Sequence, residues 1–226
     1  MKIMGIPSDK EILYNFLLNV KSQPNSAVIN SLSQLFTDRE LEATNSVKVS
    51  ETVTLESCLS KLDDLYLQPR TLENIKRVIT DIYTSNNLMI NKGKDKKAFL
   101  SIVPKLFSKD ILKMISMYDY GLTAPKIVWL TFAQGLPKYE LFLLILLNRL
   151  CFDIVLISTN GLADIEKEIS NKLYTTDYIG SLDSTYINIE TLENHFQKVE
   201  KTEPKKEKKV KEKKDNPLTK VIKFFI

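Results

Sequence analysis

Two apolar segments separated by one strongly apolar helix constrain the fold of this chain most. Residues 126–132 and 152–157 are rich in β-branched and aromatic side chains and have the length of strands that are covered on both faces. Residues 139–150 between them are apolar nearly all round, which predicts a buried helix, and Pro137 suits its first turn. The order strand, helix, strand predicts a parallel pair joined by a right-handed crossover.

The chain after this unit continues the same alternation. Residues 158–161 read as a turn and residues 162–174 as a second helix. Residues 186–189 are expected to form another strand, followed by a helix that runs through His195. We therefore expect a small α/β unit of the Rossmann type over residues 123–199.

The first 122 residues are predicted to be mainly α-helical. Ser8 and Glu11 fit a capping box. Apolar residues then recur at helical spacing in three further stretches, 12–20, 28–36 and 72–83, and Ser108 is expected to cap a helix that Gly121 ends. Residues 91–97 read as a solvated loop, and residues 43–55 fit either a loop or a short strand. The expected fold class is α/β, with a helical N-terminal half followed by the βαβ unit and a flexible tail.

The C-terminal tail carries the basic character of the chain. Residues 201–226 hold ten lysines and four acidic residues, a net charge of +6, whereas the whole chain carries +4, so residues 1–200 carry −2. This distribution argues against a nucleic-acid-binding face on the folded body. Residues 200–215 read as a Lys/Glu linker that is too polar to pack.

Residues 216–226 are predicted to form a short amphipathic helix. Such a peptide behind a polybasic linker can dock on an anionic membrane, in the groove of a protein partner, or on its own body, and the sequence leaves these three alternatives open. The expected docking side chains are Leu218, Val221, Ile222, Phe224 and Phe225.

Several classes of protein are disfavoured by what the sequence contains. Cys58 and Cys151 are far apart and belong to no CxxC motif, which predicts reduced thiols in a reducing compartment. The longest apolar stretch, 141–157, is interrupted by Asn148, Arg149 and Asp153, and it falls short of the roughly 20 apolar residues of a membrane span. We therefore expect a cytoplasmic protein, with peripheral contact to the inner membrane surface if the tail binds lipid.

No catalytic residue, metal ligand or cofactor is assigned from the sequence. His195 is the only histidine, so a structural zinc site is not expected, and its spacing on the predicted helix favours packing. Asp164 and Glu166 are two residues apart on a predicted helix and do not face one another. The dinucleotide-binding, P-loop, nucleophile-elbow and zinc-protease motifs are all missing from the sequence.

The best candidate site lies in the loops that follow the two predicted strands. Loops at the carboxyl ends of parallel strands converge, and helix N-termini beside them attract anions. Hydroxyl side chains there could donate hydrogen bonds to a phosphate, although an Asn-Gly pair is also ordinary turn chemistry. The candidate ligand-binding residues are Thr131 and Gly135 in the first loop, 131–137, and Ser158, Thr159, Asn160 and Gly161 in the second, 158–161.

The segment 125–182 resembles a known family. The resemblance rests on Pro125 and the strand after it, on the apolar helix that ends at 147–150, on residues 152–155, on Asn160 with Gly161, and on residues 164–166. These features are similar to the YceG-like family, described as a component of a "biosynthetic module" and encoded beside tellurite-resistance and stress genes in Gram-positive bacteria. The resemblance implies a role in bacterial stress resistance and supplies no reaction or catalytic residues.

Two functions are compatible with these observations. The first is a non-catalytic or regulatory component of a stress or tellurite-resistance system, which uses its body and its basic tail to bind a protein partner or the membrane. The alternative is an enzyme or sensor that binds a phosphorylated or nucleotide-type ligand between the loops 131–137 and 158–161.

Overall fold

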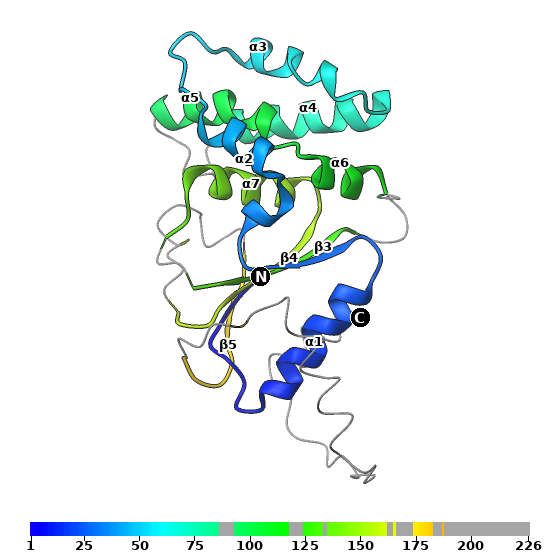
Figure 1. Ribbon diagram of the computed structural model, residues 1–226. Coiled ribbons are helices and arrows are strands. Elements are labelled where there is room, and N and C mark those ends of the chain that lie inside the picture. The colour runs from blue at the N-terminus through cyan, green and yellow to red at the C-terminus, as the bar shows by residue number, and fades with distance from the viewer. Residues whose placement is uncertain are drawn as a thin grey trace.

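The computed structural model describes residues 1–85, 93–117, 124–132, 135–161, 165, 174–182 and 187. Its centre is a five-stranded sheet in which all neighbouring strands are parallel and in the order β2-β3-β4-β1-β5 (Figure 1). The strands are β1 (Lys2–Met4), β2 (Ser26–Ile29), β3 (Lys126–Thr131), β4 (Asp153–Ser158) and β5 (Thr176–Tyr178). Strands from both ends of the described chain therefore build one sheet.

Helices cover both faces of the sheet. Helix α1 (Lys10–Ser22) packs its buried residues on one face, together with Ile3, Val155 and Ile157. Helix α7 (Lys138–Arg149) packs on the other face, together with Ile154 and Leu156. The connection from β1 to β2 runs across the sheet in one direction, and the connection from β3 to β4 runs in the other. Because both crossovers are right-handed, α1 and α7 must lie on opposite faces of the sheet.

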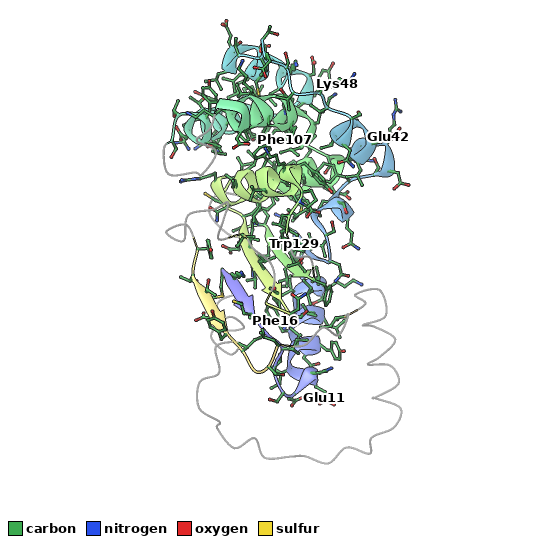
Figure 2. The ribbon with its side chains drawn as sticks, turned by 90° about the vertical axis from the view of Figure 1, so that its left-hand side faces the viewer. Glu11, Phe16, Glu42, Lys48, Phe107 and Trp129 are labelled. Carbon is green, nitrogen blue, oxygen red and sulfur yellow. The ribbon has the colours of Figure 1, made fainter. Side chains whose placement is uncertain are left out.

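A layer of helices lies on the far side of α7. These helices are all inserted between β2 and β3, which are neighbours in the sheet. Figure 1 shows α3, α4 and α5 stacked above α7, away from the strands. In Figure 2, Phe107 lies in this layer, Trp129 at the level of the sheet and Phe16 beneath it. The elements are η1 (Leu32–Leu35), α2 (Asp38–Asn45), α3 (Leu55–Ser60), η2 (Asp63–Leu65), α4 (Pro69–Thr84), α5 (Gly93–Ile102), η3 (Val103–Lys105) and α6 (Lys109–Ser116).

Local capping chemistry fixes where these helices begin. Thr37 and Glu40 form a capping box at the start of α2, and Thr54 forms another at the start of α3. The hydroxyl of Ser108 accepts a hydrogen bond from the backbone amide of Ile111, which confirms the predicted cap of α6. The first helix, in contrast, is capped by Asp9 and not by Ser8, because the Asp9 carboxylate accepts from the amide of Glu11 at 3.0 Å.

The expectation of a helical N-terminal half is only partly right. Residues 28–36, predicted as one helical stripe, contain strand β2 and the 3-10 turn η1. Val28 and Ile29 pair in register with Val128 and Trp129, so contacts with distant residues override a local helical pattern. Residues 93–97, predicted as part of a loop, belong to α5. The described part of 43–55 contains no strand.

The predicted parallel pair is confirmed. Residues 126–131 and 153–158 are strands β3 and β4, and they pair in register from Lys126 with Asp153 to Thr131 with Ser158. Strand β5 lies at 176–178, a segment for which no strand was predicted. The expected helix over 162–174, strand over 186–189 and helix through His195 fall, apart from Ile165, Tyr174 and Ile187, outside the described residues.

Candidate functional site

The structure brings the two predicted loops together at the carboxyl ends of β3 and β4. Thr131 and Ser158 are the last residues of these strands and are register partners. The side-chain amide of Asn160 donates a hydrogen bond to the backbone carbonyl of Phe132 at 3.0 Å, which ties one loop to the other. Gly135 is exposed, and a side chain added there would meet open space.

Thr131 and Ser158 lie on the α7 side of the sheet. Side chains alternate along a strand, and Ile154 and Leu156 pack against α7 whereas Val155 and Ile157 pack against α1. Continuing this alternation places Ser158, and with it Thr131, beneath α7. Both are buried, and Thr131 is 2% exposed. The helix α7 follows β3 and begins near this edge, and no side chain caps its first amides.

Thr159 is the most informative of the predicted residues. It is fully buried, and its hydroxyl has no hydrogen-bond partner among the described residues. Leaving such a group unpaired costs about 1–3 kcal/mol. The buried hydroxyls of the helical layer are instead satisfied, since Thr44 donates to the carbonyl of Glu40 at 2.8 Å and Ser108 donates to that of Leu35. A polar group that binds at this edge would complete the hydrogen bonding of Thr159.

A buried carboxylate lies near the same edge. Glu140, in the first turn of α7, is 4% exposed and accepts a hydrogen bond from the hydroxyl of Ser31, which follows β2. Burial raises the pKa of the neighbouring Tyr139, and the Glu140 charge and a hydrogen bond with it raise it further. Glu140 is not among the site residues predicted from the sequence. Its signal is a single acidic residue directly before the wholly apolar run 141–147.

Two glycines hold the loop after β1 against the loop after β5. Gly5 and Gly180 both have positive φ, 93° and 57°. A Cβ on Gly180 would lie 2.0 Å from the carbonyl oxygen of Ile6, and a Cβ on Gly5 would lie 2.3 Å from that of Ile179. The backbones of Ile6 and Ser181 exchange two hydrogen bonds, at 2.8 and 3.1 Å. Only glycine allows this close approach, and we call this contact the glycine clasp.

An apolar hollow lies at the opposite end of the strands. It opens between α7 and the amino ends of β1 and β4, and the predicted loops do not line it. Of the seven buried polar or charged residues in the described part of the chain, four lie at or near the carboxyl ends of the strands instead, namely Thr131, Glu140, Ser158 and Thr159. We therefore place the candidate site there. The hollow is lined by Met1, Lys2, Leu144, Ile145, Asn148, Arg149, Ile154, Leu156, Ile165 and Tyr174.

Other predicted residues are not positioned by the structure. Asp164, Glu166, His195 and the tail side chains between Leu218 and Phe225 lie outside the described residues. Within the described ranges, no group of three or more histidine, cysteine, aspartate or glutamate side chains could hold a metal ion. No helix in the same ranges is long and apolar enough to cross a membrane.

These features define an open, parallel α/β protein with helices on both faces of its sheet. Its buried polar side chains gather at the carboxyl ends of β3 and β4, and α1 and α7 pack on opposite faces of the sheet. The carboxyl ends of the strands are where open α/β sheets bind ligands. The chain belongs to the YceG domain family, whose model matches residues 1–222. No curated protein and no solved structure matches the chain.

Proposed function

We propose that this chain binds a phosphorylated or nucleotide-type ligand at the carboxyl edge of β3 and β4. The observation that carries the proposal is the buried hydroxyl of Thr159, which has no hydrogen-bond partner among the described residues and directly follows the buried Ser158, the register partner of the buried Thr131. Hydroxyl donors together with the uncapped first turn of α7 suit the oxygens of a phosphate. The proposal assigns binding to these residues and no reaction.

The test is a thermal-shift titration of the full chain with ATP, UDP-glucose, glucose 6-phosphate and inorganic phosphate. A ligand at a hundred times its dissociation constant adds about 2.7 kcal/mol to the stability of the native state. The informative variant is Thr159→Val, which keeps the shape of the side chain and removes the hydroxyl. Because this hydroxyl has no hydrogen-bond partner within the described ranges, we expect the variant to be at least as stable as the wild type and to lose the ligand-induced shift.

Thr44→Val is the matched control. Its hydroxyl donates to the carbonyl of Glu40 at 2.8 Å and lies 3.2 Å from that of Lys105, so the variant should be less stable and should keep the ligand-induced shift. An unchanged shift in Thr159→Val would exclude this hydroxyl from the site. A wild-type protein whose melting temperature responds to none of the four compounds would contradict the proposal.

A second role is proposed for the tail. The family match continues through residue 222 and so includes the Lys/Glu linker and most of the peptide after it. The pattern of Leu218, Val221, Ile222 and Phe225 on one helical face favours docking on a protein partner or an anionic membrane surface. With the stress-resistance role that the resemblance implies, the chain would act as a cytoplasmic regulatory component of such a system.

Deletion of residues 216–226 tests this second role. We expect the truncated chain to stay folded and bind ligand as before, but to lose its cellular location or its partner. Co-purification from the native host and sedimentation with vesicles that contain anionic lipid distinguish the two docking modes. A truncated chain with unchanged location, partners and vesicle binding would exclude a docking role for the tail.

A further inference from the structure

The last register position of the sheet places four side chains in a row on the α7 face. Thr131 pairs with Ser158, Ser158 pairs with Met4, and Met4 pairs with Tyr178. Register partners in a parallel sheet point to the same face, and Lys2, two residues before Met4, pairs with Leu156, which packs on the α7 side. All four side chains of the row therefore share the α7 face.

The four side chains of the row differ in polarity and in exposure to solvent. Thr131 and Ser158 are buried hydroxyls, Met4 is half-buried, and Tyr178 on the edge strand β5 is 69% exposed. Adjacent strands lie about 4.8 Å apart, so Tyr178 is about 10 Å from Ser158. The row therefore runs from the buried hydroxyls of Thr131 and Ser158 to the exposed aromatic ring of Tyr178.

Apolar side chains lie between the buried hydroxyls and the exposed ring of Tyr178. A Cβ added to Gly161 would lie 3.1 Å from the terminal methyl of Met4 and 3.1 Å from a methyl of Leu182, so both side chains border the turn that follows β4. Leu182 is itself 61% exposed. Partly or largely exposed apolar groups thus lie near Gly161, and Tyr178, the register partner of Met4, adds an exposed aromatic ring.

We propose that Tyr178 stacks against the base of a nucleotide whose phosphates lie at Thr131, Ser158 and Thr159. This inference rests on the proposed function and narrows its ligand class from phosphorylated compounds to nucleotides. The backbone separation of about 10 Å between Tyr178 and Ser158 is comparable with the span of a nucleotide from its base across the ribose to its phosphates. An aromatic ring tolerates any base, because every base has a π-face.

The charge of the row favours a nucleotide over a simple phosphate compound. None of its four residues is basic, so a phosphate there gains hydrogen bonds from hydroxyls and amides without an ion pair from the row. Base stacking is then a large share of the binding free energy. We expect ATP or GTP to bind more tightly than inorganic tripolyphosphate, which carries the same phosphates without base or ribose.

The experiment is calorimetric titration of the full chain and three variants with ATP, GTP and tripolyphosphate. Tyr178→Ala should weaken nucleotide binding by about 5- to 150-fold and leave tripolyphosphate binding unchanged. Tyr178→Phe keeps the ring and should bind nucleotides as the wild type does. Tyr66→Ala is the matched control, because Tyr66 is 95% exposed and lies in the helical layer, away from the sheet.

Each outcome bears on one of the two proposals. If the wild type binds tripolyphosphate as tightly as ATP and GTP, or if Tyr178→Ala binds nucleotides normally, the stacking inference is wrong and the phosphate site stands. If Tyr178→Ala loses tripolyphosphate and nucleotides equally, Tyr178 supports the site without stacking on a base, which also overturns the inference. If the wild type binds none of the three probes, the inference fails, and the panel of phosphorylated compounds then decides whether the phosphate site fails with it.

Discussion

The side-chain amide of Asn160 donates a hydrogen bond at 3.0 Å to the carbonyl of Phe132, and so joins the loop after β4 to the loop after β3. Both ends of this bond are half-buried. The bond fixes the relative position of the two loops that contain every ligand-binding residue predicted from the sequence.

Asn160→Asp should loosen this connection. The substitution replaces the donor with a carboxylate that faces a carbonyl oxygen, and we expect a loss of about 1–3 kcal/mol in the free energy of unfolding, measured by urea denaturation. Asn74→Asp is the control, because the side-chain oxygen of Asn74 accepts a hydrogen bond from Arg77 at 2.9 Å and an aspartate keeps that acceptor. Equal stability of the two variants would show that the Asn160 bond contributes little.

The glycine clasp predicts a sharp difference between two glycine substitutions. Gly180→Ala would place a Cβ 2.0 Å from a backbone oxygen at a positive φ, so it should cost at least about 2 kcal/mol of stability. Gly135→Ala adds a methyl group in open space and should change stability by less than about 1 kcal/mol. Thermal denaturation of both variants is sufficient, and comparable melting temperatures would contradict the close contact between the two loops.

How much of this arrangement could be read from the sequence differs between elements. Strands β3 and β4 and helix α7 are long and strongly apolar, so their pattern alone identifies them. Strand β1 has three residues, and Lys2 and Met4 flank a single β-branched side chain. So short a segment carries no periodicity, and its position between β4 and β5 comes from pairing with residues 154 and 174 positions away.

The candidate site likewise contains residues that could be predicted from the sequence and residues that could not. Thr131 and the residues 158–161 could be predicted because the rule for parallel strands brings their carboxyl ends together. Glu140 and Tyr178 could not be predicted as site residues. The burial of Glu140 depends on how α7 packs, and the exposure of Tyr178 depends on where β5 lies in the sheet. Nothing in the sequence around Gly5 and Gly180 marks them as special. Glycine is needed at each position because each lies against the backbone of the other loop.

The pKa of Glu40 predicts a stability difference that depends on pH. Burial alone would raise this pKa, but hydrogen bonds from the amides of Thr37 and Lys109, at 2.8 and 2.9 Å, lower it below its usual value. A lowered pKa in the folded state contributes stability that is present above the unfolded pKa, about 4.3, and is lost as the pH falls through the folded value.

Glu40→Gln should therefore be less stable than the wild type at pH 7, and the difference should shrink as the pH falls below about 4. Urea denaturation between pH 3 and pH 7 measures it. Glu42→Gln, in the same helix and exposed at the edge of the helical layer in Figure 2, is expected to have little effect at any pH. A Glu40→Gln difference that stays constant with pH would exclude the charge as its source.

The two cysteines should differ in reactivity. Cys58 is fully buried, and burial raises the pKa of its thiol to about 11 despite the opposing charge of Lys61, whereas Cys151 is exposed. At pH 8 we expect one thiol to react rapidly with Ellman's reagent in the native protein and both to react in denaturant. Cys151→Ser should abolish the rapid phase, and a rapid phase that persists in this variant would show that Cys58 is accessible.

The insertion of the helical layer between two neighbouring strands determines when the sheet can assemble. Strands β3 and β4 are joined by one short crossover, whereas β2 must close a loop of residues 30–125 to reach β3. Pulse-labelled hydrogen exchange should find the amides of 127–131 and 154–158 protected before those of 27–29.

Strand β1 emerges from the ribosome long before β4 and β5 exist, so its backbone stays without its sheet partners for most of the synthesis of the chain.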